Sequence, residues 1–81
     1  MRQVDKKRVK EIHSRLSELQ TMLIELAEEH QEWIDERNAD TDDRFESTAT
    51  GERAYDEQCT FEEWTGSVET MCEEIEELLN I

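Results

Sequence analysis

Apolar residues recur at alternating steps of three and four between residues 9 and 33. The series reads Val9, Ile12, Leu16, Leu19, Leu23, Leu26, His30 and Trp33. Such heptad spacing predicts an amphipathic helix, and a helix of this kind gains most of its stability by packing its apolar stripe against another element. The first question for this chain is therefore what covers that stripe.

A second stripe with the same spacing lies near the end of the chain. It consists of Phe61, Trp64, Val68, Met71, Ile75 and Leu78. The run of residues 38–43 between the stripes is rich in Asn, Asp and Thr, which favour turns over helix interiors. We therefore expect one helix at about 5–37, a connection at about 38–47 and a second helix at about 49–79.

The start of the second helix has two possible positions. Thr60 followed by Glu63 fits a capping box, whereas Ser47 or Thr48 fits the N-cap of a longer helix. We prefer the longer helix, because Ala54 extends the second stripe by one heptad.

The composition agrees with an all-α fold. The 81 residues include no proline and two glycines, which suits long helices. The predicted fold is a single domain, residues 1–81, folded as an antiparallel two-helix hairpin with coiled-coil-like packing. In this register Leu26 faces Phe61, Trp33 faces Ala54 and His30 faces Glu57. His30 then has either a register-setting or pH-sensing role, or a simple partner in Glu57.

Apolar residues beside the two stripes remain uncovered in a single hairpin. They are Met22, Ile24, Ala27, Ile34, Tyr55, Cys72 and Leu79. Small chains often gain stability by association, and two hairpins would cover these residues in a four-helix bundle. We therefore expect a homodimer.

The charge of the chain is strongly acidic. The formal net charge is −14, and residues 18–63 hold sixteen acidic against three basic residues, a net of −13. This charge repels nucleic acid and anionic membranes, so we expect neither as a direct partner. No apolar run is long enough for a membrane span or a secretory signal, and we expect a cytoplasmic location.

The junction between the two stripes carries a resemblance. The run from Phe45 to Glu52 is similar to the junction of small acidic helical-hairpin proteins encoded by bacteriophages and bacteria, with Phe45, Thr48, Gly51 and Glu52 matching in kind and Ala49 departing from the usual acidic residue. The resemblance implies a hairpin and a phage origin, which would place the protein in the host cytoplasm. It implies no activity.

A second, shorter resemblance concerns residues 28–32. The run Glu28, Glu29, His30, Gln31 and Glu32 has the form of the first metal-binding motif of MazG-like nucleotide pyrophosphohydrolases, which hold magnesium between acidic helices. The second motif of that family, an acidic residue three positions before an aspartate on a later helix, has no counterpart. We therefore interpret the run as a solvated acidic face, and we predict no catalytic residue, metal site or cofactor.

The favoured function is protein interaction. Rows of carboxylates with aromatic residues among them suit a basic groove on another protein, such as the nucleic-acid site of a host factor, and a phage inhibitor or DNA mimic acts in this way. The predicted partner-binding residues are Glu25, Glu28, Glu29, Glu32, Asp35, Glu36, Asp40, Asp42, Asp43, Phe45 and Tyr55. The alternatives are a MazG-like magnesium-dependent hydrolase that uses Glu28, Glu29 and Glu32, and a purely structural bundle.

Overall fold

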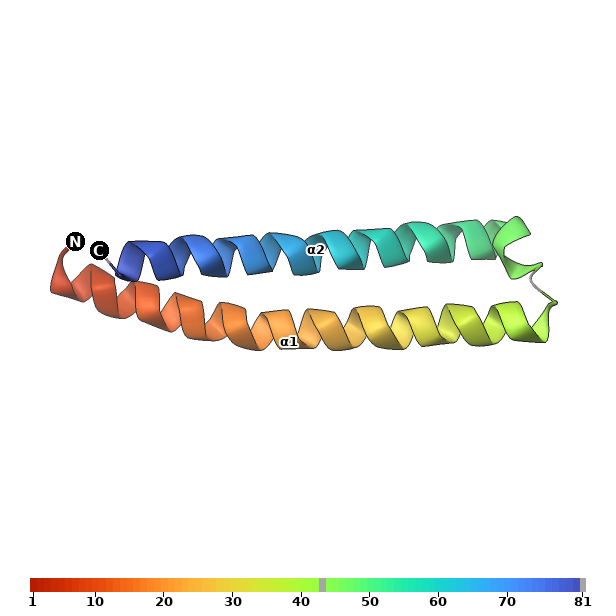
Figure 1. The fold of residues 1–81 in the computed structure, drawn as a ribbon, viewed down its shortest axis with the longest axis horizontal. Coiled ribbons are helices and arrows are strands. Elements are labelled where there is room, and N and C mark those ends of the chain that lie inside the picture. Colours follow the sequence, from red (N-terminus) through yellow and green to blue (C-terminus); the bar gives the residue numbers. More distant parts are fainter. Residues whose placement is uncertain (43, 81) are drawn as a thin grey trace.

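Two long antiparallel helices, joined through a short 3-10 turn, make up the described part of the chain (Figure 1). A computed structural model describes residues 1–42 and 44–80. Helix α1 spans Gln3–Asp40, a single 3-10 turn η1 spans Phe45–Ser47, and helix α2 spans Ala49–Leu79. The molecule is a rod of 58 × 15 × 15 Å with both termini at one end. The prediction of an all-α helical hairpin is confirmed.

Helix α1 continues three residues beyond its predicted end. Asn38 stays helical and donates a hydrogen bond from Nδ2 to the hydroxyl of Tyr55 at 2.7 Å, which ties the last turn of α1 to α2. Thr41 then ends the helix, because its backbone N–H and its hydroxyl both donate to the carbonyl of Arg37. Asp42 follows with a φ of 53°, a left-handed conformation that aspartate tolerates better than most residues.

Thr48 caps the start of α2. Its hydroxyl accepts a hydrogen bond from the N–H of Gly51 at 2.9 Å and donates one to the carbonyl of Phe45 at 2.7 Å. This cap satisfies a helix N–H that would otherwise have no partner and holds η1 against the first turn of α2. The helix therefore begins at Ala49, which confirms the prediction of the longer second helix.

Gly51 is needed because η1 lies directly against it. A Cβ at this position would stand 1.7 Å from the carbonyl oxygen of Phe45 and 2.6 Å from its carbonyl carbon. Only glycine permits this approach, which brings Phe45 over the end of the hairpin.

The two helices do not face each other with the side chains that the stripes predict. Half of each stripe is correct: Leu16, Leu23, Phe61 and Val68 are among the residues that lie partly buried between the helices. The other half is wrong, because Ile12, Leu19, Leu26, Trp33, Trp64, Met71 and Leu78 are exposed. Their places between the helices are taken by the next residues in the sequence: His13, Gln20, Ala27, Ile34, Thr65, Cys72 and Leu79.

The best-packed part of the hairpin lies at its turn. Ile34 is fully buried and forms a cluster with Phe45 and Ala54, against which Tyr55 packs. Because Phe45 comes from η1 rather than from either stripe, the turn itself supplies part of the core. Ile34 occupies the position beside Trp33, so the cluster takes up Ile34 and leaves Trp33 at the surface, 41% exposed.

A buried amide sets the register at the middle of the hairpin. Gln58 is 5% exposed. Its Nε2 donates to the carbonyl oxygen of Ala27 at 2.9 Å, and its Oε1 accepts from Nδ1 of His30 at 2.8 Å. The predicted pairing of His30 with Glu57 is therefore replaced by a pairing with the adjacent Gln58.

Neither helix carries a stretch of apolar residues sufficient to cross a membrane, within the part of the chain that the structure describes.

Candidate interaction surfaces

The predicted acidic residues of α1 are all on the surface. The exposed set in the described residues comprises Glu25, Glu28, Glu29, Glu32, Asp35, Glu36 and Asp40 on α1, with Asp42 in the turn that follows. Asp43 lies outside the described residues. The helix holds the seven carboxylates of α1 at fixed spacing along a straight axis (Figure 1).

None of these carboxylates is neutralised by a basic side chain within residues 1–42 and 44–80. The ion pairs described there join Arg2 to Asp5, His13 to Glu76 and, at 3.9 Å, Arg15 to Glu18. All three lie toward the end of the hairpin that holds the termini. The hydrogen bonds that the exposed Arg2 guanidinium donates to the Asp5 carboxylate raise the pKa of Arg2, which is charged at neutral pH in any case.

The two predicted aromatic anchors are not free. Phe45 is 5% exposed and packs in the core cluster, so the structure corrects the expectation that it contacts a partner. Tyr55 is half-buried, and its hydroxyl accepts the hydrogen bond from Asn38. This hydrogen bond ties Tyr55 to the last turn of α1 at the turn end of the hairpin.

A shallow depression crosses the two helices on the side where Gln58 reaches Ala27. It is lined by Ala27, Glu28, Gln31, Glu32, Gln58 and Glu62. Two carboxylates of the MazG-like run, Glu28 and Glu32, thus share one surface with Glu62 of α2. No group of three or more His, Cys, Asp or Glu side chains is placed to hold a metal ion in the described ranges.

The opposite side of the hairpin carries a long apolar surface. We call it the apolar face; its residues are 40–64% exposed and comprise Ile12, Leu19, Met22, Leu26 and Trp33 on α1 with Trp64, Met71 and Leu78 on α2. Trp33 and Glu57 line one hollow, and Trp64, Met71 and Leu78 follow Glu57 at intervals of seven residues. The exposed rows of the two helices therefore lie on the same side.

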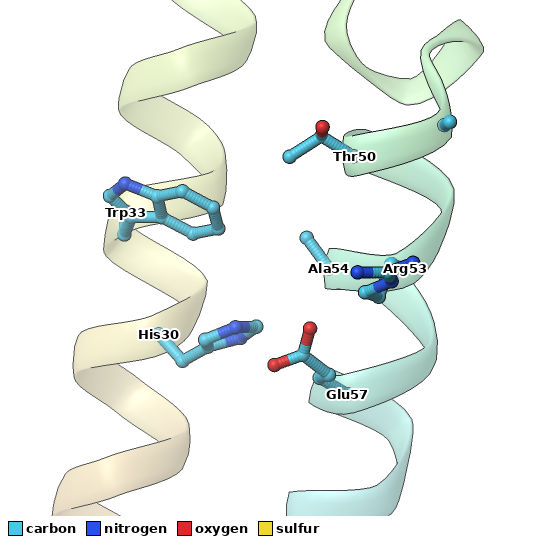
Figure 2. Close-up of a pocket in the computed structure, with 7 residues that line it drawn as sticks. His30, Trp33, Thr50, Arg53, Ala54 and Glu57 are labelled. Atoms are coloured by element: carbon cyan, nitrogen blue, oxygen red, sulfur yellow. The ribbon is translucent and has the colours of Figure 1, made fainter.

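Figure 2 shows this hollow at the turn end of the apolar face. The side chains of Trp33 and His30 extend from α1 toward α2, and Glu57 extends from α2 toward them. Tilted and edge-to-face contacts between aromatic rings continue from this hollow. The ring centre of His30 lies 5.5 Å from that of Trp33 and 5.0 Å from that of Phe61, which lies 5.7 Å from that of Trp64. Trp33 also meets the edge of Phe45 at 5.6 Å.

The heptad stripes predicted seven of the eight residues of the apolar face to lie inside the hairpin, whereas Met22 was predicted to lie outside and is exposed. One signal could have placed them correctly: each helix carries apolar residues in three adjacent rows, which is more than a single antiparallel contact can bury.

Comparison with models of protein families, with curated proteins and with solved structures finds no match to this chain.

Proposed function

We propose that this protein is a small acidic interaction module without enzymatic activity, which docks on a basic groove of a nucleic-acid-binding protein. The observation that carries the proposal is the row of exposed, unneutralised carboxylates along α1 from Glu25 to Asp40. A rigid row of this kind offers a basic protein the charge pattern of a nucleic acid without its bases.

The spacing of the charges supports nucleic-acid mimicry. At 1.5 Å rise per residue, the seven carboxylates span about 23 Å of helix, or roughly one per 4 Å. The intervening Arg37 makes the net charge of this segment −6, from seven acidic residues and one basic residue. A single DNA strand carries one charge per about 3.4 Å. Exposed acidic residues of α2 lie beside this part of α1, including Glu52, Asp56, Glu57 and Glu62, and raise the linear charge density further.

The proposed module works as a homodimer. The apolar face gathers eight exposed large apolar side chains on one side of a small protein, and apolar surfaces of this kind mark sites of association. A second hairpin packed on this face would complete a four-helix bundle. The acidic depression around Gln58 lies on the opposite side of the hairpin, so docking of a basic partner does not require the apolar face.

The test begins with affinity capture from the source cells, read out by mass spectrometry, followed by binding measurements on the captured basic protein. We expect the affinity to fall at least about tenfold between 50 and 200 mM salt, and we expect DNA to compete. Affinity that is independent of salt, or a bound protein that DNA does not displace, would contradict the proposal.

A matched pair of variants locates the docking surface. The triple variant Glu28→Gln, Glu32→Gln, Asp35→Asn removes three charges from the predicted set, and Glu11→Gln, Glu73→Gln, Glu77→Gln removes three exposed charges near the termini. Both variants change the net charge equally. We expect the first to weaken binding at least about fivefold more than the second, because short-range pairing with the groove adds to the general attraction. Equal losses would show that only the total charge matters.

A further inference from the structure

The side chains along one edge of the apolar face on α1 form a charge pattern that is complementary to itself. Arg8 and Arg15 line a groove together with Ile12 and Leu19, so they border this face directly. Continuing their row at intervals of seven residues gives, in order, Arg8, Arg15, Met22, Glu29 and Glu36, all of them exposed. The row is basic toward the termini, apolar at its centre and acidic toward the turn.

This pattern is self-complementary only in one orientation. If a second copy of α1 runs antiparallel with its Met22 beside the first Met22, each residue of the row meets the one at the same distance on the other side of the centre. Arg15 then meets Glu29, each seven residues from Met22, and Arg8 meets Glu36, each fourteen residues away. A two-fold axis across the rod duplicates both pairs.

We propose that the protein dimerises through its apolar face with the two turns at opposite ends of the bundle, about a two-fold axis that passes beside Met22 and Ser67. The inference rests on the homodimer of the proposed function. It assigns Glu29 and Glu36 to the dimer and leaves Glu25, Glu28, Glu32, Asp35 and Asp40 of α1 for the basic partner. It specifies which helices meet: α1 packs on α1 of the second copy, and α2 packs on α2.

The position of Ser67 on α2 agrees with a two-fold axis at the height of Met22. His13 Nε2 lies 3.0 Å from Glu76 Oε1, which places these two residues at one height along the rod. Met22 follows His13 by nine residues and Ser67 precedes Glu76 by nine, so Met22 and Ser67 also lie at one height. Ser67 is small and exposed, which suits a position where two copies of α2 meet.

The apolar residues pair about this centre as well. On α1, Leu19 precedes Met22 by three residues and Leu26 follows it by four, so each meets the other across the axis. On α2, Trp64 and Met71 stand at the same two offsets from Ser67 and pair in the same way. Ile12 likewise meets Trp33. The arrangement therefore buries apolar side chains against apolar side chains along α1 and at the centre of α2. At the ends of α2, Leu78 meets Glu57, since they stand eleven residues after and ten residues before Ser67.

The alternative dimer places both turns at one end. In that arrangement α1 packs on α2 of the second copy at equal height, and the two segments 18–63, each with a net charge of −13, lie side by side. The proposed orientation instead places residues 1–15, which hold six basic and two acidic residues, beside the acidic turn end of the second copy. Like charges at close range oppose the alternative, and unlike charges favour the proposed orientation.

The decisive experiment measures the distance between the two turns. A spin label on Ser47→Cys, with exposed Cys59 changed to Ser and buried Cys72 retained, reports the separation by pulsed electron resonance. The proposed dimer separates the labels by about the length of the rod, 58 Å. A separation below about 30 Å, the width of two rods of 15 Å, would overturn the orientation and leave the homodimer standing. Sedimentation of the unaltered chain as a monomer would overturn both.

Disulfide formation tests the axis directly. In the same Cys59→Ser background, Met22→Cys should cross-link to itself under mild oxidation, because the two thiols meet at the axis. Thr21→Cys is the matched control, since Thr21 is exposed one residue away and points away from the second copy. In the alternative dimer Met22 lies beside Ser67 of the second copy. The proposed axis would be refuted if the Met22→Cys protein did not cross-link to itself but did cross-link to the Ser67→Cys protein when the two were mixed.

Charge reversal tests the pairing of the flanking rows. Arg15→Glu alone should raise the dimer dissociation constant roughly tenfold, because two attractive pairs become repulsive. Glu29→Arg added to Arg15→Glu should restore it to within about threefold of the unaltered protein. If the double variant dimerises no better than Arg15→Glu, the two residues do not meet and the proposed register is wrong.

Discussion

The two glycines of α2 provide a stringent test of the fold, because the same substitution should act in opposite directions at the two positions. Gly51 lies at the start of the helix against η1, and Gly66 lies in its interior. Replacing either by alanine adds one methyl group and increases helix propensity. Only the surroundings of the new Cβ differ.

At Gly66 a Cβ would meet nothing within 4 Å. The substitution Gly66→Ala therefore brings only the gain in helix propensity, about 0.5–1 kcal/mol in favour of the folded state. At Gly51 the Cβ would stand 1.7 Å from a backbone oxygen and 3.1 Å from the Cα of Glu46. Backbone cannot rotate away as a side chain can, so Gly51→Ala must displace η1 and with it Phe45, at a cost of about 3 kcal/mol.

Thermal unfolding followed by circular dichroism, at one protein concentration for all variants, measures both effects. For a chain of this size 1 kcal/mol shifts the Tm by about 4–8 °C. We expect Gly66→Ala to raise the Tm by roughly 3–6 °C and Gly51→Ala to lower it by about 10 °C or more. Urea titration should give the same order of midpoints with an unchanged slope.

Two results would refute this reasoning. A Gly51→Ala protein as stable as the natural one would show that η1 does not lie against the first turn of α2. A Gly66→Ala protein with a lowered Tm would show that another surface packs on Gly66, which would also contradict the proposed dimer, because that dimer leaves Gly66 free.

Three further predictions concern the turn and the interior. Thr48→Ala should destabilise the protein by about 1–2 kcal/mol in urea titration, because it removes both the N-cap and the hydroxyl that donates to Phe45; a change below about 0.3 kcal/mol would contradict the capping role. Ile34→Ala should cost about 2–5 kcal/mol in the same assay, since Ile34 is the one fully buried large side chain in the described part of the chain; a cost below 1 kcal/mol would place the core elsewhere. A thiol reagent should modify exposed Cys59 rapidly and buried Cys72 only after unfolding, and equal rates under native conditions would refute the packing of Cys72.

The hairpin could be predicted because two long heptad stripes joined by a turn-rich segment admit few other folds. The rotation of each helix could not be predicted from the same pattern. In both stripes one row faces the other helix, and either of two adjacent rows can complete the contact. Choosing the more apolar row selected Trp33 and Trp64, whereas the structure selects Ile34 and Thr65.

Contacts from outside the stripes decide the rotation. Phe45 reaches Ile34 and Ala54 only because η1 folds back over Gly51, and no periodicity in the sequence describes that approach. Gln58 also fixes the rotation of the helices, through its hydrogen bonds to His30 and to the carbonyl of Ala27. From the sequence alone, a single glutamine in a charged helix looks like a surface residue. The exposed carboxylates were predictable, because an unpaired charge is costly to bury.

The two sides of α1 should perform different tasks, and consecutive glutamates can separate them. Glu28 lines the acidic depression that crosses to Glu62, whereas Glu29 continues the row of Arg15 and Met22 beside the apolar face. Glu28→Arg and Glu29→Arg change the net charge of the chain equally at neighbouring positions. We expect Glu29→Arg to weaken the dimer roughly tenfold in sedimentation equilibrium, because it brings two arginines together across the axis, while Glu28→Arg leaves the dimer intact and weakens docking of the basic partner. If both variants affected dimerisation and docking equally, one surface would serve both interactions, and the division of this helix into a self-association side and a docking side would be wrong.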